Sequence, residues 1–330
     1  MLTLGIETSC DETAAAVLKD GHTVLSNIIR SQTDIHAPFG GVVPEIAYRA
    51  HLFHIEQVVQ ESLHEAGCKP RDIDLVSVTR GPGLMGALLI GVAYAEQWAW
   101  ALDKPVIGVN HLEAHLCAGL LEHVDLDFPF IGLVISGGHT LLVHAKALGS
   151  YEVLGRTRDD AVGEAYDKVA SLLSLPYPGG PAIDALAKKG DPKRFDFPRP
   201  MLRSNDFNFS FSGLKTSVLY MLKDFPPDQI PVADIAASFQ KAVTDVLLAK
   251  VVCAMDQKQA NKIVFGGGVA ANSEIRSIFN TKVGINIKIY FPSKLMCTDN
   301  ALMIANIGYL RYQNGLTKDD IIDADDHWML

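Results

Sequence analysis

The chain has 330 residues, of which 48% are hydrophobic and 20% charged, which excludes a disordered protein and predicts two packed lobes rather than one core. Its formal net charge of −9 excludes a strong overall attraction to nucleic acid. No apolar run is long enough to cross a bilayer, the N-terminus lacks the features of a secretion signal, and the cysteines are scattered, so we expect a cytoplasmic protein without disulfide bonds.

Two segments of the chain share one pattern of elements. In each, short apolar stretches predict a β-hairpin with a small polar tip, then a third strand and a long helix. The first copy comprises segments 2–6, 14–18, 23–29 and 44–66. The second copy comprises segments 130–135, 141–145, 151–154 and 159–173.

This duplication is the plan of the two-lobed α/β folds of actin, Hsp70 and sugar kinases, the ASKHA class. In that class the two hairpin tips hold the phosphates of a nucleotide in the cleft between the lobes. We therefore expect an N-terminal lobe formed by 1–127 with a returning C-terminal segment at 296–330. We expect a C-terminal lobe at 128–295 that carries the glycine turns.

Glycine-rich turns in the second half are further candidates for a ligand site. Segment 262–265 predicts a strand that ends at Gly266-Gly267-Gly268, and a helix opens at 269. The sequence YPGGP at 177–181 leads into a helix that carries Asp184. Backbone N–H groups at such turns can converge on an anion, although each turn can equally be a simple connection. The chain lacks a P-loop motif and its 266–268 turn is not G-x-G-x-x-G, which disfavours P-loop and Rossmann folds.

The stretch NHLEAHL at 110–116 places two histidines, His111 and His115, one helical turn apart on the same face. Such a pair can chelate a metal ion or decorate a surface. It is not the zinc-protease motif, because Glu113 would lie about 200° around the helix from both histidines. Asp299, before a predicted helix at 301–312, could add a carboxylate ligand, or it could cap that helix. Two histidines and one carboxylate with open positions are typical of a reactive iron or zinc centre.

A basic stretch between Lys188 and Arg203 interrupts the acidic sequence. It predicts either a solvated face of a helix and loop or a surface that binds along the phosphate backbone of a nucleic acid.

Longer motifs connect these features to one family. The chain resembles the TsaD family of bacterial tRNA N6-adenosine threonylcarbamoyltransferases, once described as O-sialoglycoprotein endopeptidases. The resemblance spans nearly the whole chain and rests on motifs that occur in order: GIETSCDET (5–13), GGVVPE (40–45), GPGLMGALL (81–89), NHLEAHL (110–116), SGGHT (136–140), GEAYDKVA (163–170), YPGGP (177–181), FPRPM (197–201), FSFSGLKT (209–216), GGGVAAN (266–272) and CTDNALMIA (297–305).

The resemblance implies a reaction and a cofactor. The threonylcarbamoyl group moves from threonylcarbamoyl-AMP to N6 of the adenine just 3′ of the anticodon, tRNA position 37, in tRNAs that read ANN codons, forming t6A. His111, His115 and Asp299 match the ligands of one Fe²⁺ per subunit, with Zn²⁺ possible in preparations. In bacteria the family works with a smaller paralogue that lacks the metal site, TsaB, and with a P-loop ATPase, TsaE.

The resemblance also implies an adenylate site. The positions that match it are Val134, Ile135, Ser136, Gly137, Gly138, Asp167, Gly180, Asp184 and Asn272. Two departures from the family stand out. Val134 and Ile135 precede the Ser136 turn where archaeal and eukaryotic relatives carry a tyrosine ligand. Bacterial relatives commonly carry arginines before a tryptophan near the C-terminus, whereas here Asp325, Asp326 and His327 precede Trp328, so the sequence gives no support for a basic tail that holds tRNA.

The transfer also needs a group that takes a proton from the attacking amine. Candidates at the predicted hairpin tips are Asp11, Glu12 and His139, and we favour Glu12. Rival interpretations are an ATPase or sugar kinase of the same fold, which would leave the two histidines unexplained, and a non-catalytic assembly subunit, for which a complete set of metal ligands would be unnecessary.

Overall fold

The computed structural model describes residues 1–316 and 322–330. The chain folds into two compact units. Unit 1 comprises Met1–Leu126 and Thr298–Leu330, and unit 2 comprises Asp127–Cys297. Among the described residues, no helix is long and apolar enough to cross a membrane, and all five cysteines are free thiols.

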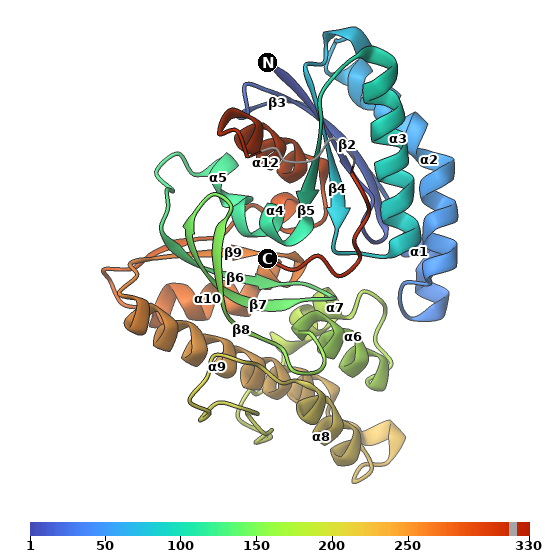
Figure 1. The fold of residues 1–330 in the computed structure, drawn as a ribbon. Coiled ribbons are helices and arrows are strands. Elements are labelled where there is room, and N and C mark those ends of the chain that lie inside the picture. Colours follow the sequence, from blue (N-terminus) through green and yellow to red (C-terminus); the bar gives the residue numbers. More distant parts are fainter. Residues whose placement is uncertain (317–321) are drawn as a thin grey trace. The chain divides into compact units, whose positions relative to one another are not determined.

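Unit 1 is built on a five-stranded sheet with the order β3-β2-β1-β4-β5 (Figure 1). The central strand β1 pairs antiparallel with β2 and parallel with β4. The five strands are β1 (Leu2–Glu7), β2 (Glu12–Lys19), β3 (Thr23–Ser31), β4 (Leu75–Gly81) and β5 (Val106–Asn110).

Helices cover both faces of this sheet, which is why β1 and β4 are buried along almost their whole length. In Figure 1, α2 (Pro44–Glu65) and α3 (Met85–Leu102) cover one face and α12 (Ala301–Gln313) lies on the other. The shorter helices of unit 1 are α1 (Thr33–His36), η1 (Ala37–Phe39), η2 (Pro70–Asp72), α4 (His111–Cys117) and α5 (Gly119–Glu122).

Two glycines let α12 approach the sheet closely. A Cβ on Gly5 of β1 would lie 2.3 Å from the carbonyl oxygen of Ala301, and a Cβ on Gly308 would lie 1.8 Å from Oγ of Ser77. Any larger residue at these positions would push the helix off the sheet. The close contact at Gly5 therefore fixes the position of Ala301, the first residue of α12, two residues after Asp299.

Unit 2 contains a second sheet, with the order β10-β9-β6-β7-β8. Its strands are β6 (Phe130–Ile135), β7 (Thr140–Ala147), β8 (Ser150–Arg156), β9 (Lys262–Gly266) and β10 (Lys288–Tyr290). Its helices are α6 (Val162–Leu172), α7 (Gly179–Ala187), α8 (Ser212–Leu222), η3 (Pro227–Gln229), α9 (Val232–Lys258), η4 (Gly268–Ala271), α10 (Ser273–Lys282) and α11 (Lys294–Cys297).

The two sheets have one topology. Each starts with a three-stranded antiparallel meander and adds two parallel strands beside the first strand of the meander. The predicted β-β-β-α repeat is therefore confirmed.

Two predicted helix starts in unit 2 were wrong. The helix expected from 159 begins at Val162, because the Asp159 carboxylate instead accepts hydrogen bonds from the backbone N–H groups of Phe211 and Ser212 at the start of α8. The helix expected from 269 begins as the short 3₁₀ turn η4, and the α-helix starts only at Ser273.

Candidate active site

The stretch NHLEAHL forms the end of β5 and the whole of α4. Asn110 is the N-cap, and its Oδ1 accepts hydrogen bonds from the backbone N–H groups of Leu112 at 2.9 Å and Glu113 at 3.1 Å. The cap fixes His111 as the first helical residue, so His115 lies one turn later on the same face. The predicted helical placement of the two histidines is confirmed.

Asp299 precedes α12, but it does not cap it. The N-cap is the neighbouring Asn300, whose Oδ1 accepts from the backbone N–H of Met303 at 3.2 Å. The alternative role for Asp299 as the capping residue was therefore wrong. Sequence alone could not separate the two residues, because aspartate and asparagine cap helices equally well.

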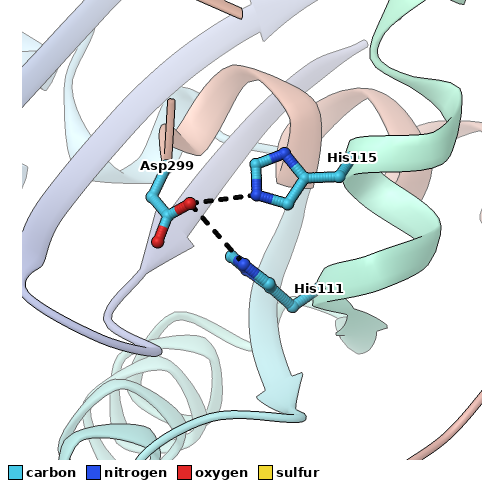
Figure 2. A group of neighbouring side chains, drawn as sticks. All are labelled: His111, His115 and Asp299. Atoms are coloured by element: carbon cyan, nitrogen blue, oxygen red, sulfur yellow. Dashed lines mark hydrogen bonds and ion pairs between the residues drawn. The ribbon is translucent and has the colours of Figure 1, made fainter. Parts of the chain in front are cut away.

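The three side chains converge (Figure 2). One ligand atom from each of His111, His115 and Asp299 lies within 4.8 Å of the other two. Oδ1 of Asp299 lies 2.9 Å from Nε2 of His115 and 3.6 Å from Nε2 of His111. Both histidines are buried, and their rings meet edge to face. The structure thus contains a His/His/Asp cluster with the ligand set of a metal site.

The charges of the cluster also suit a cation. Burial opposes a positive charge on His111, but Asp299 and Glu7 outweigh it and raise the pKa of His111 to about 9. Nδ1 of His115 is buried and has no hydrogen-bond partner among the described residues. Both Nε2 atoms face the same carboxylate oxygen, so a divalent ion held there would replace a proton as the positive charge.

Glu113 lies outside this cluster. Its carboxylate pairs with Nη1 of Arg311 on α12 at 2.5 Å, and Glu113 itself is only 1% exposed. The arrangement agrees with the helical geometry, which turns Glu113 away from the two histidines. A protease-like role for Glu113 is therefore excluded.

Asp299→Asn should weaken metal binding far more than Glu113→Gln, because only Asp299 contributes an oxygen to the cluster. Titration of each purified variant with Zn²⁺ against a chromophoric chelator measures the two affinities. Equal losses in the two variants would contradict the ligand set.

The first hairpin tip carries Glu12 at the start of β2. Ser31 donates a hydrogen bond to its Oε1 at 3.2 Å. Burial raises the pKa of Glu12 to about 10, and the nearby charges of Asp299 and Asp11 add to the effect. Glu12 thus lies in the electrostatic field of the cluster. The other candidate, His139, lies in unit 2, where its backbone closes the turn by exchanging hydrogen bonds with Ser136.

The residues predicted to hold the adenylate all lie in unit 2. The Ser136–Gly138 turn follows β6, and the Gly267–Gly268 turn follows β9. Because β6 and β9 are parallel neighbours, both turns lie at the same edge of the sheet, where ligands bind in open α/β sheets. A Cβ on Gly137, Gly138 or Gly268 would meet no atom within 4 Å, so a ligand can approach the backbone there. The same is true of Gly180, at the start of α7.

The side chains of Val134 and Ile135 are fully buried in the core of unit 2. Only their backbone atoms could therefore contact a ligand. Asp167 of α6 accepts a hydrogen bond from the backbone N–H of Gly179 at 2.8 Å, which ties α6 to the start of α7.

Asp184 and Asn272 are linked through a residue that the sequence did not reveal. Gln240, buried in the middle of α9, donates to Oδ1 of Asp184 at 3.3 Å and accepts from Nδ2 of Asn272 at 2.8 Å. Asp184 also accepts from the Ser273 hydroxyl, and Asn272 caps α10. Gln240 belongs to no glycine turn or charged motif, so no local signal identifies it.

Comparison with known proteins decides between the interpretations. The sequence model of the family TsaD, tRNA N6-adenosine threonylcarbamoyltransferase, matches residues 23–306. The chain belongs to this family. Threonylcarbamoyltransferases of Clostridioides difficile and Thermosipho africanus are each 51% identical to it over 98% of the chain, which covers 97% and 98% of those proteins.

Among solved structures, HypF of T. kodakarensis superposes with a TM-score of 0.63 at 17% identity, over 95% of this chain and 48% of that one. This likeness concerns the fold alone and confirms the two-lobed ASKHA class. The protein is thus a threonylcarbamoyltransferase that modifies N6 of adenosine in tRNA, and not a sugar kinase or a purely structural subunit.

Proposed function

We propose that this threonylcarbamoyltransferase uses threonylcarbamoyl-AMP as donor and modifies the adenine just 3′ of the anticodon in tRNAs that read ANN codons. The convergence of His111, His115 and Asp299, in a chain of this family, carries the proposal.

Unit 2 holds the adenylate in this proposal. Backbone N–H groups of the turn at Ser136, Gly137 and Gly138 donate to the phosphate, which becomes the leaving group and gains charge as the acyl bond breaks. Asp184 and Asn272, oriented by Gln240, hold the nucleoside part, and the open space beside Gly180 and Gly268 admits it.

Unit 1 holds the metal, which we assign as Fe²⁺. His111 and His115 supply neutral nitrogen ligands and Asp299 supplies a carboxylate oxygen. A metal ion held by these residues would supply Lewis-acid chemistry for the carbamoyl carbonyl or an anchor for the threonyl carboxylate. No tyrosine precedes the Ser136 turn, so other coordination positions are left to substrate or water.

Glu12 is the proposed general base for the attacking N6 amine. With a pKa of about 10 its carboxyl group is protonated at neutral pH in the metal-free protein. Burial is the largest cause of this raised pKa, and a cation held beside Asp299 would cancel one of the charges that add to it, which would favour the carboxylate form that accepts the proton. His139, on the second hairpin turn, is the alternative base.

The proposed partners are the bacterial paralogue TsaB and the ATPase TsaE, in the cytoplasm. The decisive experiment follows labelled threonylcarbamate from threonylcarbamoyl-AMP to tRNA transcripts, with and without these partners. Transcripts with adenine or guanine 3′ of the anticodon form the matched pair. Equal label in both transcripts would contradict the assigned target, and no transfer to either transcript in the presence of both partners would contradict the reaction.

The basic stretch between Lys188 and Arg203 is the proposed tRNA surface. Ion pairs within the protein reduce the number of its cationic side chains that can contact phosphate. Arg194 and Arg199 are paired with carboxylates of α9, those of Asp234 and Asp245. Three exposed cations make no ion pair with the described residues: Lys189, Lys193 and Arg203.

Substitution of Lys189 and Lys193 by glutamate reverses their charges and should therefore weaken tRNA binding. Each lost phosphate contact should reduce the slope of log K against log salt concentration by about 1. Binding titrations at several salt concentrations measure this slope. Arg194→Glu is a poor probe, because it would place two carboxylates together at Asp234. An unchanged slope with lost binding of TsaB would assign the surface to protein recognition instead.

A further inference from the structure

A carboxylate that is not a metal ligand lies directly behind His111. Glu7, the last residue of β1, is completely buried. Its Oε1 accepts a hydrogen bond from the backbone N–H of Ser9 at 2.5 Å. Its Oε2 accepts from the hydroxyl of Thr79 at 2.6 Å and lies 3.1 Å from Nδ1 of His111.

These contacts fix where the proton of the neutral His111 ring resides. Nδ1 of His111 also lies 3.2 Å from the hydroxyl oxygen of Ser9. An ionised carboxylate only accepts hydrogen bonds, so the contact with Glu7 requires that Nδ1 of His111 carries the hydrogen, and the Ser9 hydroxyl then directs its own hydrogen away from the ring. The ring then presents an unprotonated Nε2, and this atom faces Asp299. Carboxylate–histidine–metal chains orient histidine ligands in this way.

The two histidines are not equivalent in this respect. Nδ1 of His115 has no hydrogen-bond partner among the described residues. Only the His111 ring is therefore held by a charged group at Nδ1. Glu7 and Asp299 together provide two negative charges beside two neutral rings, which balance a divalent cation.

We propose that Glu7 is the positioning residue of the metal centre: it holds His111 as the Nδ1–H tautomer and adds the second negative charge. This inference rests on the proposed metal site. Sequence reasoning missed Glu7 because its partner Thr79 lies on β4, 72 residues away, and meets it only through the parallel pairing of β1 with β4.

Glu7→Gln tests the proposal with almost no change in volume. The N–H of Ser9 needs an oxygen opposite it, so the new amide N–H₂ must take the position of Oε2. There it donates to Nδ1 of His111, and the ring changes to the tautomer with hydrogen on Nε2. A metal ion must then displace that hydrogen, so we expect Zn²⁺ affinity to fall by about 10- to 100-fold in competition with a chelator.

A second measurement reports the tautomer of His111 directly. In the Zn²⁺-loaded wild type, ¹⁵N NMR of labelled histidine should show His111 with hydrogen on Nδ1, protected from exchange by Glu7. Glu113→Gln is the matched control, since it changes a buried carboxylate on α4 to an amide without touching the cluster, and it should keep the wild-type affinity and spectrum.

Thr79→Val is a second variant, which keeps the negative charge of Glu7 and removes one hydrogen-bond donor to it. It should lose less Zn²⁺ affinity than Glu7→Gln. If Glu7→Gln does not fold, Thr79→Val still tests the role of Glu7. Wild-type affinity in both folded variants, with metal lost in His111→Ala, would overturn the role of Glu7 alone. Metal retained in His111→Ala would instead overturn the metal site on which the inference rests.

Discussion

His111→Ala and His115→Ala should each lose the bound metal and most of the transfer activity while the protein stays folded. Each substitution removes one of three converging ligands, so the loss of affinity should exceed the roughly 100-fold that removal of an orienting partner costs. Alanine favours helix, and the cap at Asn110 is unaffected, so α4 should persist.

Metal analysis by mass spectrometry, a melting curve and the labelled transfer assay on each purified variant check this result. Glu122→Gln, on the neighbouring α5 and outside the cluster, is a control that should retain metal and activity. A His111→Ala protein with the metal content of the wild type would refute the assignment.

Glu113→Ala should produce the second large effect, on stability rather than on metal. Glu113 is buried and pairs with Arg311, which is 21% exposed. Removal of one partner of such a pair leaves the other charge poorly solvated, and we expect a loss of about 3 kcal/mol in the free energy of unfolding of unit 1. The pair joins α4 to α12, the two helices that flank the metal ligands.

Denaturant titrations of Glu113→Ala, Arg311→Met and the double variant measure the coupling between the two residues. The double variant should lose less than the sum of the single changes, because neither charge is then left without its partner. Additive losses would show that the contact contributes nothing of its own. Zn²⁺ affinity, measured where each variant is folded, should stay close to wild type.

Local patterns predicted much of this protein correctly. Alternation of apolar and polar segments identified both meanders, and the spacing of His111 and His115 gave their common helical face. Asp299 could be added only through the plan of the two-lobed fold and the family resemblance, because nothing local says that α12 returns to the first sheet.

The residues that sequence reasoning missed share one property: their partners are distant in the chain. Glu7 depends on Thr79 of a neighbouring strand, and Gln240 depends on Asp184 and Asn272 of two other helices. The ion pairs within the basic stretch could not be predicted for the same reason, since the carboxylates that pair with Arg194 and Arg199 come from α9. Side-chain pairing of this kind depends on tertiary packing and produces no periodic pattern in the sequence.

The close packing of α12 against β1 at Gly5 has a consequence for folding during translation. The strand β1 is translated well before α12, the helix that covers it, and all of unit 2 is made between them. A nascent chain that has not reached Asp299 therefore exposes one face of its first sheet and holds the two histidines without their carboxylate. Metal binding by all three side chains of the proposed site therefore has to await translation of Asp299, and a product truncated before this residue would lack the third ligand.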